Sequence, residues 1–257
     1  PWDRFYALKG AVMDLDALAF GAHADDVELA CGGTLIALAS LGYKTGVVAL
    51  TQGEMATRGS VEIRAQEFKD SAEIMGLAAH QMLDIPDGRV EVTWENKIKI
   101  IKILRVYKPR IVFAPYWVER HPDHEQTSHL VRHAAYLAGL KKLETGDSPF
   151  RPNKVIFYQS RFEFTPSFIV DISESHEQKM KAVRAYRSQF FSKGQTGSEN
   201  EETTIGRPEF LDRLDSRDRH WGGKIGVKYG EPFLVREAIK LKDPVAFFGP
   251  EYLWTMP

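Results

Sequence analysis

Cysteine, excess charge of one sign and long apolar runs are all scarce in this 257-residue sequence. The single cysteine, Cys31, excludes an intramolecular disulfide and fits a reducing compartment such as the cytoplasm. The 34 basic and 35 acidic residues give a formal charge of -1, which argues against nucleic acid or an anionic membrane as partner. No apolar run approaches the ~18 residues of a membrane-spanning helix. The start at Pro1, without a signal-like pattern, fits a chain that begins inside a longer gene product.

What is present is material for a folded core. Hydrophobic residues make up 43% of the chain and aromatic residues 11%, which excludes disorder as a global description. Short apolar runs alternate with segments of helical period, a pattern typical of β-α-β units around a mostly parallel sheet. We therefore predict an α/β fold and a single domain over residues 1–257. Residues 192–207 have almost no large apolar side chains and predict a mobile loop or lid, with a disordered surface connection as the alternative.

The pattern places the elements as follows. Strands are predicted at 16–20, 45–50, 81–85, 111–114, 154–159 and 167–172. Helices are predicted from Asp26 to the stop at Gly42, over 61–75, over 94–107, from Pro122 onward and over 174–190.

Imidazole and carboxylate groups gather directly after two of these strands. His23, Asp25 and Asp26 follow the first strand, and the run His121-Pro122-Asp123-His124 follows the strand at 111–114. Ligands of open α/β sheets bind outside the carboxyl ends of the strands. A catalytic zinc takes three protein ligands and leaves a fourth position for water, and His23, Asp26 and His124 could supply that set. The sequence therefore predicts one zinc ion per chain.

The remaining polar groups of the two clusters suit the other tasks of a metal-assisted hydrolysis. Asp25 can face the attacking water as general base while its neighbour faces the metal. His121 shares a helix face with His124, so in protonated form it could hold a developing oxyanion, and Asp123 could pair with an imidazole to fix its tautomer. The alternatives are that Asp25 and Asp26 merely cap a helix and that the second cluster is a solvated helix start. Two such clusters, each after a buried strand, favour the metal site.

These motifs resemble the LmbE/PIG-L family of zinc-dependent N-acetyl-sugar deacetylases. The resemblance runs from about Asp16 to Val235 and includes AHADDVE at 22–28, HPDH at 121–124, TQGEMATRGSVEIRAQE at 51–67, FIVDIS at 168–173 and KMKAVRAYRSQF at 179–190. Within the family, the chain is most similar to the branch that deacetylates N-acetylglucosaminyl malate in bacillithiol synthesis. One departure is Ala24, where the family usually has proline; this frees the backbone there but removes no ligand.

The resemblance implies a Rossmann-like three-layer α/β/α fold and a homo-oligomer. It also implies zinc held by His23, Asp26 and His124, Asp25 as base, and His121 as the electrophilic or acid histidine. Arg64 is implied to contact the sugar.

The substrate and the reaction class leave alternatives open. Arg58 and Arg120 could bind malate carboxylates, since a guanidinium pairs bidentately with a carboxylate, but a surface role is an equal alternative. The same metal site could act on another N-acetylglucosamine-containing glycan, glycolipid or thiol conjugate. Metal-dependent phosphoester hydrolysis is a further alternative, although two-metal sites usually need more ligands. The non-enzyme alternative is a nucleotide-binding or regulatory module, which the absence of a Gly-x-Gly-x-x-Gly turn disfavours.

Overall fold

A seven-stranded sheet forms the centre of the protein in the computed structural model, which describes residues 14–190 and 203–248. The strand order is β3-β2-β1-β4-β5-β7-β6. The first five of these strands in spatial order run parallel, whereas β7 is antiparallel to both β5 and β6. Their bounds are β1 Ala17–Gly21, β2 Thr45–Ala49, β3 Ala79–Met82, β4 Ile111–Pro115, β5 Lys154–Tyr158, β6 Phe168–Asp171 and β7 Gly230–Leu234.

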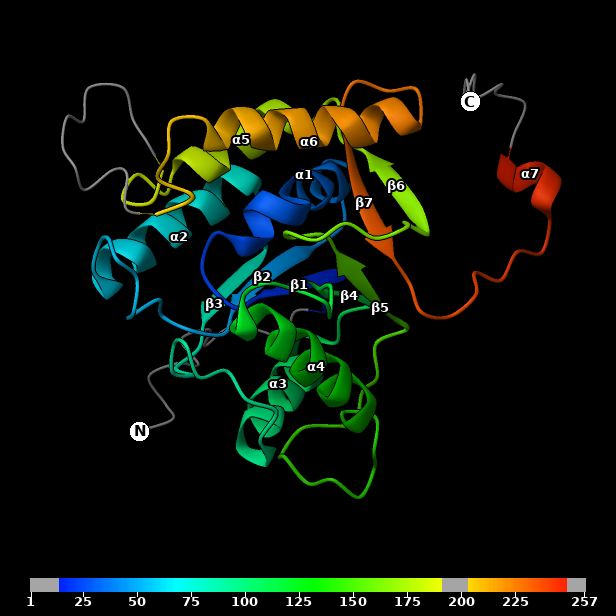
Figure 1. Ribbon diagram of the computed structural model, residues 1–257. Coiled ribbons are helices and arrows are strands. Elements are labelled where there is room, and N and C mark those ends of the chain that lie inside the picture. The colour runs from blue at the N-terminus through cyan, green and yellow to red at the C-terminus, as the bar shows by residue number, and fades with distance from the viewer. Residues whose placement is uncertain (1–13, 191–202, 249–257) are drawn as a thin grey trace.

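Helices cover both faces of the sheet and give the three layers expected of a Rossmann-like fold (Figure 1). One face carries α3 and α4, and the opposite face carries α1, α2, α5 and α6. Each face has its own buried apolar cluster, because the parallel strands are apolar on both sides. The helix bounds are α1 Asp26–Ser40, α2 Val61–Met75, α3 Trp94–Tyr107, α4 Pro122–Leu137, α5 His176–Arg184, α6 Phe210–Lys224 and α7 Pro244–Phe248.

The point where the strand order reverses lies between β1 and β4 at the middle of the sheet. The chain leaves β1 into α1 on one face and leaves β4 into α4 on the other. The loops after these two strands therefore diverge and open a crevice at the carboxyl edge of the sheet. The fold brings the two predicted clusters, which are about a hundred residues apart in sequence, to the two sides of this crevice.

Most predicted elements are confirmed, and the differences have a tertiary cause. Helices α2 and α3 have the predicted bounds, and α4 begins at Pro122. Strand β3 begins two residues earlier than predicted and ends at Met82. The helix predicted to reach residue 190 ends at Arg184, because the next segment turns toward α2, where the Ser188 amide and hydroxyl donate to Glu67 at 2.6 and 2.7 Å. Elements α6, β7 and α7 were not predicted.

Two predictions concern parts of the chain that the structure covers incompletely. Residues 192–202 of the predicted loop or lid lie outside the described residues, while Thr203, Thr204 and Ile205 line the cavity described below. The single domain over 1–257 stays a prediction. In the ranges that the structure describes, no helix is long and apolar enough to cross a membrane.

Candidate active site

The first cluster follows β1 in a turn with an unusual backbone. Asp25 has φ 112° and ψ -26°, a positive φ that residues other than glycine seldom adopt. It stands at the N-terminal boundary of α1, yet its side chain makes no capping hydrogen bond. The alternative in which Asp25 serves as an ordinary helix cap is therefore wrong. Backbone strain of this kind persists only where the surroundings impose it, and it is frequent at functional sites.

The second cluster begins α4 in the predicted way. Pro122 occupies the first helical turn, and Nδ1 of His121 accepts a hydrogen bond from the amide of Asp123 at 3.2 Å. His121 and His124 stack with ring centroids 4.9 Å apart, so both imidazoles lie on the same side of the helix start. Because Nδ1 of His121 is an acceptor here, a proton on the neutral ring belongs on Nε2.

Both clusters open into one cavity of about 600 Å³. Residues from the loops after β1, β2, β4 and β5 and from α6 line it. The predicted site residues among them are His23, Asp25, Asp26, Arg64, Arg120, His121 and His124. Asp123 contacts His23 just behind this wall, and Arg58 is not among the lining residues.

His23, Asp26 and His124 form a group with the spacing of a metal site. Their candidate ligand atoms all lie within 4.8 Å of one another. Nδ1 of His23 is 3.6 Å from Oδ2 of Asp26, and Nε2 of His124 is 3.1 Å from Oδ1 of Asp26. Tetrahedral ligands at the usual metal distances of ~2.0–2.2 Å are themselves separated by roughly 3.3–3.5 Å. The donor set fits a divalent ion with room for a further ligand.

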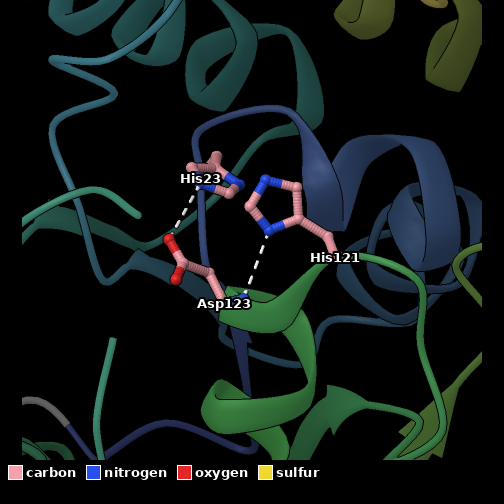
Figure 2. A group of neighbouring side chains, drawn as sticks. All are labelled: His23, His121 and Asp123. Atoms are coloured by element: carbon pink, nitrogen blue, oxygen red, sulfur yellow. Dashed lines mark hydrogen bonds and ion pairs between the residues drawn. The ribbon is translucent and has the colours of Figure 1, made fainter. Parts of the chain in front are cut away.

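Two carboxylates behind His23 fix the orientation of its ring, and Figure 2 shows one of them, Asp123. Nε2 of His23 lies 2.9 Å from Oδ1 of Asp87 and 3.5 Å from Oδ2 of Asp123. Asp123 is itself held by the amides of Gly88 and Val90, at 2.7 and 3.2 Å. A ring that donates from Nε2 presents Nδ1 to the metal position, which is the usual support of a metal-binding histidine. Asp123 thus pairs with the imidazole of His23, while its backbone amide donates to His121.

These contacts shift the pKa values within the ligand group. Burial opposes ionisation of Asp26, but the charge and hydrogen bond of His124, together with those of His23, hold the pKa of Asp26 well below its usual range. Burial lowers the pKa of His23, but its hydrogen bonds to Asp123, Asp26 and Asp87 raise it well above 6.5. The metal-free protein therefore holds a proton that a bound metal must displace.

Asp25 has the properties of a general base. Burial raises its pKa to about 6, and this effect is opposed by the charge of Arg64 and reinforced by that of Asp26. Arg64 is itself buried; one of its guanidinium nitrogens donates to the carbonyl of Ala24 at 2.6 Å and another lies 3.5 Å from Oδ2 of Asp25. Arg64 therefore supports the strained turn from behind as well as lining the cavity.

Arginines gather along the outer wall of the cavity. Arg120 lines it together with Arg161, Arg213 and Arg217. The Arg58 guanidinium packs against Gly206 instead, so closely that a Cβ on that glycine would collide with Nη1 of Arg58. Four residues of this site were not predicted from the sequence: Asp87, Arg161, Arg213 and Arg217. None of these four lies in a recognised motif, and only the fold brings them to the cavity.

Comparison with known proteins identifies a family and several relatives of this chain. The profile of the family described as PIG-L, GlcNAc-PI de-N-acetylase, matches residues 18–135. The diacetylchitobiose deacetylase of Thermococcus kodakarensis is 34% identical over 65% of this chain and 67% of its own length. A probable N-acetyl-alpha-D-glucosaminyl L-malate deacetylase 2 of Bacillus cereus is 27% identical over 69% of this chain and 84% of its own. The crystal structure of the conserved protein TT1542 from Thermus thermophilus superposes with a TM-score of 0.80 at 38% identity, covering 90% of this chain and 98% of that one.

A three-layer α/β fold with a His-Asp-His group and a buried carboxylate at the point of strand reversal defines a metal-dependent hydrolase. The chain belongs to the PIG-L family and is an N-deacetylase of that family. Membership favours deacetylation over the phosphoester and nucleotide-binding alternatives.

Proposed function

We propose that this protein removes the acetyl group from the amino nitrogen of a glucosamine conjugate, using zinc held by His23, Asp26 and His124. The observation that supports this best is the placement of Asp25, a buried carboxylate whose pKa is about 6, in the same cavity as the three candidate ligands. A zinc ion held by these three residues would supply Lewis acidity at the acetyl carbonyl and would lower the pKa of the attacking water toward ~7.

The residues of the chain supply the proton transfers. Asp25 accepts a proton from the attacking water, for which its pKa of about 6 is suited. His121 donates from Nε2 to the developing oxyanion, since its Nδ1 is occupied by the Asp123 amide. Burial, with the charges of His23 and His124, lowers the pKa of His121, so a neutral imidazole performs this role near pH 7, and not the protonated form expected from the sequence. The amine leaves with the proton that Asp25 accepted from the water, because a neutral His121 would become an imidazolate if it gave up its only proton.

The arginines that line the cavity favour a substrate with an anionic group. We propose N-acetylglucosaminyl malate, as in bacillithiol synthesis, with Arg120 as a ligand of the malate carboxylates and Arg64 near the sugar. Arg120 is exposed at the cavity, where a guanidinium can pair with a carboxylate bidentately. Arg161 and Arg213 add positive charge to the same wall. Arg58 stays a prediction as a second carboxylate ligand. The alternative substrate is another N-acetylglucosamine-containing glycan, glycolipid or thiol conjugate, including a neutral one such as diacetylchitobiose.

Acetate release from two substrates, N-acetylglucosaminyl malate and N,N'-diacetylchitobiose, tests this proposal. The protein is assayed as purified, after chelation and after return of zinc, alongside Asp25→Ala and Arg120→Gln. We expect chelation to abolish acetate release and zinc to restore it. Asp25→Ala is expected to lower kcat on the order of 100-fold or more, because it removes the base. Arg120→Gln is expected to raise KM for the malate conjugate about tenfold and to leave KM for the neutral disaccharide within about twofold.

The possible outcomes distinguish an error in the proposed mechanism from an error in the proposed substrate. Full activity of the thoroughly demetallated protein or of Asp25→Ala contradicts the mechanism. A preference for the neutral disaccharide, with no effect of Arg120→Gln on either substrate, keeps the mechanism and contradicts the malate assignment.

We further propose that the protein is a cytoplasmic homo-oligomer. The segment after β7, residues 236–248, runs outward from the sheet to α7 (Figure 1). Ile239 and Val245 in this segment are 50% and 82% exposed, and apolar side chains at such exposure fit a surface that a second copy of the chain covers. A single cysteine supports a reducing compartment.

A further inference from the structure

Helix α1 is broken one turn after the end that carries the catalytic carboxylates. Cys31 has φ -140° and ψ 18°, which is not helical. In a continuous helix the carbonyl of Leu29 accepts a hydrogen bond from the amide of Gly33. A break leaves carbonyls of the first segment and amides of the second without their regular partners. Gly33 and Thr34 on the amide side are buried and Leu29 on the carbonyl side is half-buried, so these backbone groups need partners from elsewhere.

Glu231 of β7 binds the amide side of the break. Its Oε1 accepts from the amide of Gly33 at 3.0 Å, and its Oε2 accepts from the amide and hydroxyl of Thr34 at 2.7 and 2.6 Å. The carboxylate therefore caps the second segment of α1 from a different part of the chain. A Cβ on Gly33 would lie 2.9 Å from Cδ1 of Ile172 and 3.0 Å from Oε1 of Glu231, and the two contacts together explain the glycine at this position.

Arg217 of α6 binds the carbonyl side. Its Nη2 donates to the Leu29 carbonyl at 2.5 Å and lies 3.1 Å from Oδ1 of the neighbouring Asp218. A charged donor on this carbonyl replaces the hydrogen bond that the break removes. Residues far from α1 in the sequence thus hold the two sides of the break from two separate elements.

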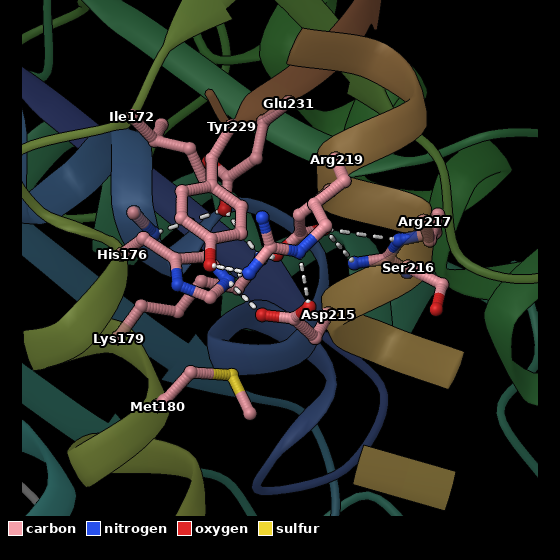
Figure 3. A network of polar contacts seen from close by, with 12 residues as sticks. Ile172, His176, Lys179, Met180, Asp215, Ser216, Arg217, Arg219, Tyr229 and Glu231 are labelled. Carbon is pink, nitrogen blue, oxygen red and sulfur yellow. Dashed lines mark hydrogen bonds and ion pairs between the residues drawn. The ribbon is translucent and has the colours of Figure 1, made fainter. Parts of the chain in front are cut away.

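Lys179 of α5 joins these two contacts, and Figure 3 draws it together with Glu231 and Arg217. Its Nζ lies 2.6 Å from Oδ2 of Asp218 and 2.8 Å from Oε1 of Glu231, and all three side chains are fully buried. With Arg217 the group has two positive and two negative charges, so each buried charge has an opposite partner. The result is one closed set of contacts that runs from the Leu29 carbonyl to the Gly33 and Thr34 amides.

We propose that Glu231 and Arg217, joined through Lys179 and Asp218, are positioning residues for the catalytic end of α1. Only one turn separates the Leu29 carbonyl from Asp25 and Asp26, and the amide of Leu29 donates to the Asp25 carbonyl at 2.9 Å. These four side chains, three of them fully buried and Arg217 half-buried, fix the direction of this turn relative to α5, α6 and β7. They thereby hold one carboxylate toward the metal position and the other toward the attacking water. This inference rests on the proposed function for its catalytic consequence.

Glu231→Gln and Thr34→Val test the proposal, because neither residue lines the cavity. Glu231→Gln keeps the shape but removes the charge, and Thr34→Val removes one donor with almost no change of volume. Arg219→Met is the matched control: it lies in α6 two residues after Arg217 and contacts Asp215 and the Tyr229 hydroxyl on the outer side of the group. For each protein we would measure kcat and KM, zinc affinity, thermal unfolding, and hydrogen exchange of the amides in residues 26–36.

For Glu231→Gln we expect kcat to fall on the order of 10- to 100-fold, with KM within about threefold, because misplacement of reacting groups acts mainly on kcat. Zinc affinity is expected to fall about tenfold, and exchange over 26–36 to become faster. Thr34→Val should change the same quantities in the same direction but less, with kcat falling roughly two- to fivefold, because it removes only one of the hydrogen bonds to Glu231. Arg219→Met should lower the unfolding temperature while leaving kcat, zinc affinity and exchange over 26–36 unchanged.

The proposal is overturned if folded Glu231→Gln and Thr34→Val lose stability but keep the parental kcat, zinc affinity and exchange, as a merely structural role predicts. It is equally overturned if Arg219→Met reproduces their effects. If Glu231→Gln does not fold, the isosteric Thr34→Val decides by the same criteria. Absence of acetate release from the parent contradicts the proposed function alone, because exchange over 26–36 still reports whether these residues hold the break.

Discussion

At the scale of single residues, Asp25 has two features that each lower the stability of the folded protein and that a purely structural residue would avoid. Its backbone occupies a positive φ of 112°, and its carboxylate is buried beside Asp26. The nearby charge of Arg64 offsets part of this cost but leaves the pKa at about 6. A folded-state pKa above the unfolded value of 3.8 means that the contribution of Asp25 to stability is present below pH 3.8 and is lost as the pH rises through about 6.

Asp25→Asn is therefore expected to stabilise the metal-free protein at pH 8 while it removes activity. The gain in the free energy of unfolding should be of the order of 1–3 kcal/mol, because the amide has no charge to bury and asparagine tolerates positive φ. At pH 4 the gain should shrink toward zero. Denaturant unfolding of the metal-free proteins at both pH values measures this.

Asp70→Asn, on the solvent-facing side of α2, serves as the control and should change stability little at either pH. A lower stability of Asp25→Asn than of the parent at pH 8 contradicts the account of Asp25 as a strained, buried base.

At the scale of elements, α6 approaches β7 through glycine. A Cβ on Gly222 would lie 2.6 Å from the backbone nitrogen of Tyr229, just before β7 begins. The backbone of Tyr229 cannot move aside as a flexible side chain can, so this close contact fixes the position of α6 relative to β7. The neighbouring Gly223 has nothing within 4 Å of its Cβ position and is exposed. Because Arg217 lies in the same helix, the seating of α6 also determines where that guanidinium meets α1.

Gly222→Ala should therefore destabilise the protein by roughly 1–3 kcal/mol through overpacking. Gly223→Ala, one residue along the same helix, should instead stabilise it by about 0.5–1 kcal/mol, because alanine is the better helix former. Chemical denaturation of the pair measures both effects. Equal effects of the two substitutions would show that the close contact with Tyr229 does not constrain α6.

At the scale of the whole molecule, the outward segment 236–248 leaves the sheet at a different place from the cavity. The cavity opens at the carboxyl ends of β1 and β4, whereas the outward segment leaves the sheet after β7 and runs away from it (Figure 1). Self-association through this segment would therefore leave the cavity accessible to substrate.

Val245→Asp is expected to shift the protein toward smaller assemblies by light scattering coupled to size-exclusion chromatography, since a charge at a contact between copies costs desolvation energy. The control is Leu41→Asp, because Leu41 is similarly exposed at 74% but lies at the end of α1. A monomeric parent, or equal effects of both substitutions, contradicts the proposed role of the segment.

The sequence alone determined the features that depend on neighbours along the chain. Apolar periodicity and terminal signals placed α2, α3 and the start of α4, and two runs of four residues contained all three candidate metal ligands and the candidate base. Such features are local because helix ends, turns and residues three apart are set by the backbone between them.

Tertiary structure decided the contacts between segments far apart in the chain. Asp87 reaches His23 from 64 positions away, Arg217 reaches Leu29 from 188, and Glu231 reaches Thr34 from 197, and no periodicity relates such positions. The helix predicted to reach residue 190 ends earlier for a similar reason, because the Ser188 amide donates to Glu67, which is 121 positions away in the sequence. The sequence thus identified the candidate reacting groups, and tertiary structure placed α5, α6 and β7 against α1 beside them, because only folding brings those elements together.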